Sequence, residues 1–106
     1  MSITSDLIRG NTDTIILAHL MHKNSYGYEI NKSIIEKTNG QYELKEATLY
    51  TAFRRLEEMS MITSYWGDEN SGARRRYYSI TDLGKKYYEQ SKVDWKNAKN
   101  LIDELI

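Results

Sequence analysis

The stretch Glu46-Ala-Thr-Leu-Tyr-Thr-Ala-Phe-Arg-Arg-Leu-Glu-Glu-Met59 decides the fold, because its side chains separate into two faces at the period of a helix. Leu49, Phe53 and Leu56 fall at i, i+4 and i+7, and this apolar stripe predicts burial against a core. The opposite face carries small, hydroxyl-bearing and cationic side chains: Ala47, Thr51 and Arg54. Taken alone, the stretch favours an ordinary amphipathic helix with a solvated polar face. The same polar face would also suit a helix that enters a DNA major groove.

Composition limits the class of protein. The chain has 106 residues, of which 40% are hydrophobic and 28% charged, as in a single soluble domain with its own core. It contains no cysteine, which excludes disulfides and thiol chemistry. The longest apolar run, residues 15–18, is too short for a membrane span, and the N-terminus lacks a signal-peptide pattern, so we expect a cytoplasmic protein. Its 15 basic and 15 acidic residues cancel, which excludes a nonspecific polycation but not a specific DNA binder.

Two helices are predicted before the opening stretch. The first covers residues 4–21 and is apolar on more than one side, so we expect it to pack against two surfaces, although residues 9–13 interrupt it with polar side chains. The second covers residues 26–37, after a predicted cap at Asn24-Ser25.

The second helix is predicted to bury Ile30 and Ile34 and to end at Asn39-Gly40, where a left-handed conformation would stop it. A short extended piece, residues 41–44, then leads into the opening stretch. Two helices joined by a brief connection of this kind are typical of a helix-turn-helix.

A β-hairpin is predicted after the opening stretch, because residues 62–67 and 74–80 alternate around the turn-forming residues 68–72. If Ile62 pairs near Ile80, one face carries four side chains: Ser64, Trp66, Arg76 and Tyr78. The other face carries Tyr65, Arg75, Tyr77 and Ser79. We therefore expect Arg76 to stack on Trp66 and Arg75 to remain free.

The triplet Arg74-Arg75-Arg76 is the densest charge in the chain, and it lies beside Gly72 near the hairpin tip. A solvated hairpin is the simpler interpretation, but three successive arginines favour contact with nucleic acid, since guanidinium groups are permanent multi-donor cations. Three helices followed by a basic hairpin give the order of a winged helix-turn-helix. The predicted fold is thus mainly α with a small β-hairpin.

A final helix, capped by Thr81-Asp82, is predicted to run to residue 106. Every seventh residue repeats in two series that form an a/d seam: Tyr88, Trp95 and Ile102, and Ser91, Ala98 and Leu105. The rest of the helix is largely polar, so the seam needs another surface, and a second copy of the chain is the expected partner. We therefore predict a DNA-binding domain over residues 1–80 and a dimerisation helix over residues 81–106.

At this point the motifs resemble a family. They are Tyr26-Gly-Tyr-Glu-Ile30, Glu46-Ala-Thr-Leu-Tyr50, Arg55-Leu-Glu57, Ile62, Gly72, Arg76-Tyr-Tyr-Ser-Ile-Thr81 and Gly84. Together they resemble the PadR family of bacterial transcriptional regulators over nearly the whole chain, and the short ending is similar to its smaller subgroup. The sequence departs from the family at Ser60, where glycine is frequent, and at Ala73, where glycine or proline is common.

The resemblance implies a homodimeric winged-helix repressor whose last helix mediates dimerisation. It also implies that the third helix and the wing face double-stranded DNA, with Tyr26, Tyr28 and Tyr50 on phosphates. The implied DNA-binding residues are Tyr26, Tyr28, Thr48, Tyr50, Thr51, Arg54, Gly72, Arg74, Arg75 and Arg76. The two-face pattern supports Thr51 and Arg54 independently, whereas it puts Tyr50 at the edge of the core.

Trp95 has small seam neighbours, so the seam leaves either a tightly packed dimer core or a gap beside the indole. Some small PadR-type regulators are similar and bind flat aromatic compounds between paired tryptophans, which implies release of a repressor by such an effector. Nearby lysines oppose a cationic ligand, while Asp94 favours one. The expected effector and dimer residues are Leu7, Thr14, Tyr88, Ser91, Trp95, Ala98 and Ile102.

Other functions find less support. His19 and His22 stand at i and i+3, but without a third ligand they favour ordinary histidines over a metal site. No nucleophile–base arrangement or phosphate-binding glycine loop is present, so we expect neither an enzyme nor a cofactor. A winged-helix module that binds proteins and not DNA remains the alternative, favoured by net neutrality and opposed by the arginine triplet.

Overall fold

The computed structural model describes residues 2–67 and 74–106 and has the predicted architecture, mainly α with one small antiparallel hairpin. The elements in chain order are α1 (Ile3–Arg9), α2 (Thr12–Leu20), α3 (Gly27–Lys37), α4 (Glu46–Glu58), β1 (Ile62–Trp66), β2 (Arg76–Ile80) and α5 (Asp82–Leu105). Within these described ranges, no helix combines the length and the apolar content that crossing a bilayer requires.

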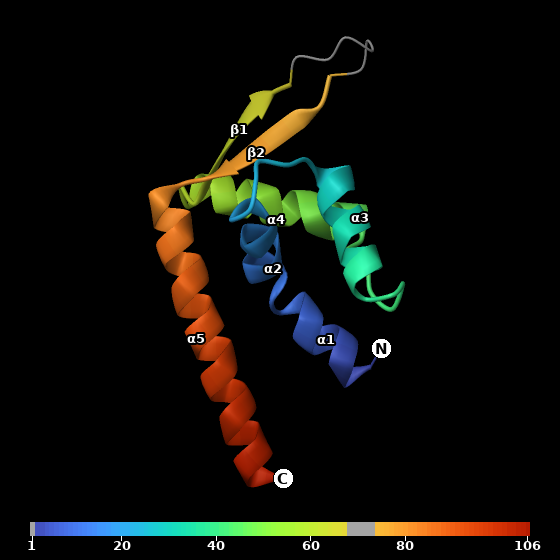
Figure 1. The fold of residues 1–106 in the computed structure, drawn as a ribbon, viewed down its shortest axis with the longest axis vertical. Coiled ribbons are helices and arrows are strands. Elements are labelled where there is room, and N and C mark those ends of the chain that lie inside the picture. Colours follow the sequence, from blue (N-terminus) through green and yellow to red (C-terminus); the bar gives the residue numbers. More distant parts are fainter. Residues whose placement is uncertain (1, 68–73) are drawn as a thin grey trace.

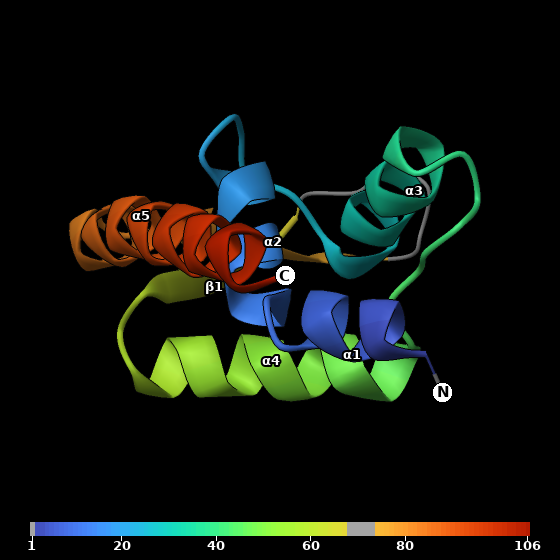
Figure 2. The ribbon, with the colours of Figure 1, turned by 90° about the horizontal axis from the view of Figure 1, so that it is seen from below.

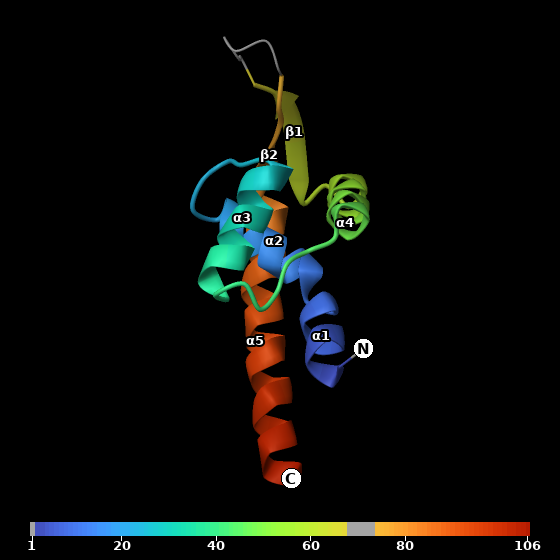
Figure 3. The same ribbon diagram turned by 90° about the vertical axis from the view of Figure 1, so that its right-hand side faces the viewer.

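The molecule is elongated, with extents of 54 × 30 × 21 Å. The hairpin projects at one end and α5 runs from its base to the opposite end, where the C-terminus lies (Figure 1). In Figure 1, α4 runs across the body from near the start of α5 toward α3. Figure 3 shows α3 and α4 on opposite sides of α2, and α1 extends from the body in the same general direction as α5.

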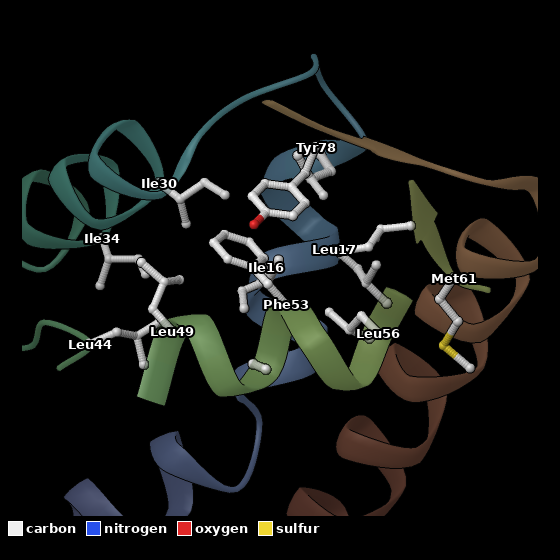
Figure 4. Packing of buried hydrophobic residues seen from close by; sticks show 13 residues of the cluster. Ile16, Leu17, Ile30, Ile34, Leu44, Leu49, Phe53, Leu56, Met61 and Tyr78 are labelled. Carbon is white, nitrogen blue, oxygen red and sulfur yellow. The ribbon is translucent and has the colours of Figure 1, made fainter. Parts of the chain in front are cut away.

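The core forms where α4 meets α2, α3 and the hairpin (Figure 4). The predicted stripe of Leu49, Phe53 and Leu56 is buried, and the ring of Phe53 stacks on Tyr78 of β2 with centroids 3.9 Å apart. The other core side chains are Ile16, Leu17, Leu20, Ile30, Ile34, Leu44, Ala52, Met61 and Ile62. Burial of this stripe fixes which face of α4 remains outward.

The predicted single helix over residues 4–21 is wrong, because the structure has two helices separated at Gly10 and Asn11. The Asn11 amide donates to the carbonyl of Leu7 at 2.8 Å, and the Thr12 hydroxyl donates to the carbonyl of Arg9 at 2.6 Å. These polar side chains compete for the last-turn carbonyls of α1, so the interrupting segment ends the helix. α1 itself contains no buried residue, whereas α2 is buried on several sides.

The predicted cap at Asn24-Ser25 is also wrong, since α3 has Tyr26 at its N-cap with no side-chain cap bond. Ser25 instead pairs its backbone with Tyr78, in two hydrogen bonds of 3.2 and 2.7 Å, and its hydroxyl donates to Glu29. The predicted left-handed stop is confirmed, because Asn39 and Gly40 have φ of 52° and 78°.

The hairpin and its flanks match the sequence pattern. Ile62 pairs with Ile80, and the predicted two faces follow from that register. Ser60, at the position where the resembled family often has glycine, adopts φ 60°, so a left-handed turn precedes β1. Thr81 caps α5 as predicted, because its side chain accepts from the Gly84 amide at 3.1 Å.

Candidate functional site

The outward face of α4 carries the predicted hydroxyl and cationic groups. Thr51 and Arg54 are exposed, and Thr48 is half-buried beside them. Arg55, on the flank of this face, is already paired: its guanidinium donates through Nε and Nη2 to the carboxylate of Asp13. That hydrogen bond raises the pKa of Arg55. α4 therefore presents a small, accessible polar surface whose orientation Asp13 helps to fix.

The three tyrosines assigned to phosphates lie together where α3 and α4 begin. Tyr28 is 73% exposed, and Tyr26 is half-buried, with its ring edge-to-face against Tyr77 of the hairpin and the two ring centroids 5.2 Å apart. Tyr50 has one side on Phe53, with centroids 5.7 Å apart, and its hydroxyl approaches Gly27. A Cβ at Gly27 would lie only 3.1 Å from that hydroxyl, so the absence of a side chain at Gly27 makes room for the phenol of Tyr50.

The hairpin arginines lie on aromatic rings. Arg74 and Arg76 flank Trp66, with guanidinium carbons 5.4 and 5.8 Å from its ring centroid. The expectation that Arg75 is free is wrong, because its guanidinium lies 4.9 Å from the ring centroid of Tyr26. Alternation sends Arg75 to the hairpin face of Tyr77, and both side chains contact Tyr26 at the N-cap of α3, which sequence periodicity alone does not reveal. The remaining predicted residue, Gly72, lies outside the described residues.

Glu57, at the end of α4, was not predicted as a site residue. Its carboxylate accepts from the Ser64 hydroxyl at 2.8 Å and from Arg76 at 3.5 Å, and Arg76 also donates to Ser64 at 2.8 Å. The end of α4 and the base of the hairpin are thus connected by a charge-assisted network. The shared hairpin face of Ser64 and Arg76 was visible in the sequence, but its contact with Glu57 was not.

These groups line one hollow of about 400 Å³ between α3, α4 and the hairpin. Its lining residues are Tyr26, Gly27, Tyr28, Tyr50, Trp66, Arg74, Arg75 and Arg76. Three phenols and three guanidinium groups converge there, and these are donors that bind phosphate oxygens. Chemically, this concave surface suits a polyanion backbone, which would pass beside the outward face of α4.

A second, more apolar cavity of about 270 Å³ lies between α1, α2 and α5. The structure brings together the predicted Leu7, Thr14 and Trp95, and adds Ile8, Asn11, Ile15 and Lys92. The other seam residues do not line it. Tyr88 packs against the core, Ser91 is half-buried, and Ala98 and Ile102 are exposed further along α5.

The two histidines differ in burial. His19 is partly buried and its pKa is lowered, chiefly by burial, while His22 is exposed. Within residues 2–67 and 74–106, no three His, Cys, Asp or Glu side chains are grouped so that they would hold a metal ion.

Comparison with known proteins agrees with this geometry. The model of the transcriptional regulator PadR-like family matches residues 16–90. A transcriptional regulator from Clostridium thermocellum has a similar structure, with a TM-score of 0.90 and 50% identity over 99% of both chains. A PadR family transcription regulator from Clostridium difficile R20291 gives a TM-score of 0.79 and 38% identity, over 90% of this chain and 97% of that one. A Lysinibacillus sphaericus protein described only as uncharacterized is 46% identical, over 95% of this chain and 93% of its own.

Proposed function

Because the chain belongs to the PadR-like family of transcriptional regulators, whose members are not enzymes, we propose that it regulates transcription by binding operator DNA directly. The observation that carries this proposal is the hollow of phenols and guanidinium groups beside α4. α4 would enter the major groove, and the hairpin would act as the wing. DNA lies in the bacterial cytoplasm, which is where the protein would act.

The DNA contacts would be of two kinds, to base edges and to the phosphate backbone. Thr48, Thr51 and Arg54 on α4 would face base edges and so set sequence preference. The tyrosines and wing arginines of the hollow would hold the phosphate backbone, which sets affinity and register but not sequence. Arg75 fits the second role, since its stacking on Tyr26 presents a cation and a phenol together.

The protein would act as a homodimer, with residues 1–80 as the DNA-binding domain and residues 81–106 as the dimerisation helix. The exposed apolar side chains of α5, among them Ile102 and Leu105, support this assignment. Two copies would read half-sites separated by about 34–36 Å, one turn of DNA, or by a multiple of that distance. Bound at an operator, such a dimer would act as a repressor.

The apolar cavity at Trp95 would receive a small aromatic effector. It lies between α5, which would join the two copies, and α1–α2, which support α4. A ligand that separated these elements would change the spacing of the two α4 helices and release the operator. Quenching of tryptophan fluorescence by planar aromatics tests this step, and Trp95→Phe identifies which of the two tryptophans responds.

Measuring affinity for DNA from the promoter of the protein's own operon against salt tests DNA binding. We expect affinity to fall by orders of magnitude between about 50 and 200 mM salt, because counterions are released from phosphates. Thr51→Val and Arg54→Ala should change the preference among operator variants, whereas Arg75→Ala should weaken all sequences alike. Lys99→Ala, on α5 away from the hollow, is the control with the same charge change as Arg75→Ala. No DNA affinity at low salt would instead favour a protein-interaction module.

A further inference from the structure

The flank of α4 opposite Tyr50 carries an ion pair between Arg55 and Asp13 of α2. We propose that Asp13 is a positioning residue that holds the Arg55 guanidinium against the body and keeps it off the duplex, which lowers the sequence-independent affinity of the protein for DNA. This inference rests on the proposed binding of DNA through α4 and names the residue that limits one part of that binding.

Arg55 lies where a DNA-binding α4 would meet the duplex. Its side chain is 46% exposed, and it lines a hollow of about 350 Å³ together with Thr51 and Thr48, one and two turns earlier on the same helix. These two threonines are the proposed base-contacting residues, so DNA would pass close to the guanidinium. An arginine in that position would normally contact phosphate oxygens.

Asp13 occupies the edge of the guanidinium that such a contact would use. Both oxygens of its carboxylate accept from Arg55, one from Nη2 and the other from Nε at 3.1 Å. This bidentate geometry is also the one in which arginine binds phosphate. The Asp13 side chain is only 20% exposed, so the carboxylate holds the guanidinium from the side of the body. A phosphate would have to displace one anion with another to reach the same edge.

The pair contributes less to the packing of α4 than to the placement of the guanidinium. Ile16 and Leu17 of α2 are buried in the same core as Phe53 and Leu56 of α4, so apolar contacts already join the two helices. A partly exposed ion pair adds little to packing of that kind. Replacing Asp13 should therefore leave the fold in place and change mainly where the guanidinium lies.

The two flanks of α4 differ in how their cations are balanced. The second guanidinium of the Arg55 hollow, that of Arg9, also pairs with a carboxylate, Asp6, at 2.7 Å. In the hollow beside the hairpin, Arg74 lies on the ring of Trp66, and an aromatic ring leaves the positive charge in place. The hairpin flank is therefore the one that attracts a phosphate backbone, and Asp13 helps to keep the opposite flank neutral.

Asp13→Asn tests the proposal, because the amide has nearly the same shape but no charge. Binding of the full-length protein to a duplex of unrelated sequence is measured by fluorescence anisotropy over a salt series. We expect the variant to bind about threefold more tightly, with a slope of log affinity against log salt that is steeper by roughly 0.9, the value for one added phosphate contact. Replacing a residue that only supported the fold would weaken binding.

Two further variants show whether the gain acts through Arg55. The double variant Asp13→Asn with Arg55→Met has the net charge of the native protein and lacks the guanidinium, so it should bind within about 1.5-fold of the native protein. Asp103→Asn, exposed near the end of α5, removes the same charge as Asp13→Asn and should leave affinity unchanged. Urea unfolding of each variant shows that the fold is retained.

The outcomes separate this inference from the proposed function. A native protein without DNA affinity at low salt would overturn the proposed function, and the inference with it. If the native protein binds DNA, an Asp13→Asn variant that binds no more tightly, or that fails to fold, would overturn the inference alone. It would also be overturned if the gain persisted in the double variant, which would make it a general charge effect. Markedly weaker binding by the double variant would show that Arg55 contacts DNA in the native protein.

Discussion

The two halves of α5 differ in how they meet the rest of the chain. At its start, Gly84 is buried so closely against the carbonyl of Met61 that a Cβ would lie 2.2 Å from that oxygen. In its second half, Ile102 and Leu105 are 46% and 82% exposed. One end is therefore fixed by backbone contact within the chain, and the other has an apolar seam that the described residues leave exposed.

This difference separates two kinds of stability. Contacts at the start of α5 act within a single copy and set the direction in which the helix leaves the body (Figure 2). Contacts of the seam would act only when a second copy is present, so their contribution depends on protein concentration. The angle at which α5 leaves the body would therefore set where the second copy, with its own α4, is held.

The largest effect is expected from a charge in the seam. Ile102→Asp should raise the dissociation constant of the proposed dimer by roughly 100-fold, about 3 kcal/mol, because association would bury an unpaired carboxylate. Sedimentation velocity over a concentration series measures this. Asn100→Asp adds the same charge at the f position of the heptad, away from the seam, and should leave association unchanged. An Ile102→Asp protein that stayed as dimeric as the control would contradict the seam assignment.

A second prediction concerns the packed end. Gly84→Ala should destabilise the protein by about 2–3 kcal/mol, although alanine normally favours helices, because the backbone of Met61 has to move. Gly10→Ala is the matched control. It lies in right-handed helical conformation, and its Cβ would meet carbonyl oxygens of α1 at an ordinary 3.5 Å, so it should stabilise by about 0.5 kcal/mol. Urea unfolding measures the change in unfolding free energy for each variant. If both variants shifted it in the same direction, the predicted difference between Gly84 and Gly10 would be refuted.

The sequence predicted the packed elements better than their junctions. The stripe of α4 and the pairing of Ile62 with Ile80 follow from local periodicity, so both were predicted correctly. The break at Gly10 was not placed, because whether a polar segment ends a helix depends on which carbonyls its side chains reach.

In the candidate site, residue types were easier to predict than partners. The two-face pattern of α4 predicted the exposed positions of Thr51 and Arg54. The contacts of Arg75 with Tyr26 and of Glu57 with Arg76 join elements 49 and 19 residues apart in sequence (75 − 26 and 76 − 57), so no local pattern contains them. At the Trp95 cavity, the expected Leu7 and Thr14 lie with the indole, whereas the further lining by Ile8, Asn11 and Ile15 depends on how α1 packs near α5.

A smaller effect is expected where α4 meets the hairpin. Glu57→Gln should weaken operator binding about threefold relative to Glu58→Gln, because the network to Ser64 and Arg76 would lose its charge and hold the wing less firmly. Both variants remove one negative charge, so their general effect on attraction to DNA is the same. Fluorescence anisotropy at fixed salt measures the ratio. Equal operator affinities of the Glu57→Gln and Glu58→Gln variants would show that DNA binding does not depend on the contact between Glu57 and the hairpin.

The smallest effect concerns His19, a titratable group on the packed side of the molecule. Burial, assisted by Lys37, lowers its folded-state pKa below 6.5, while Glu29 opposes the shift and Lys23 adds to it. The unfolded chain therefore takes the proton first as pH falls below 6.5. Stability is unaffected above that pH and declines as pH decreases, until the folded protein is protonated too. His19→Gln should flatten the dependence of urea midpoints on pH between about 7.5 and 5. The same substitution at the exposed His22 is the matched control, and it should retain the dependence because it leaves the buried His19 in place.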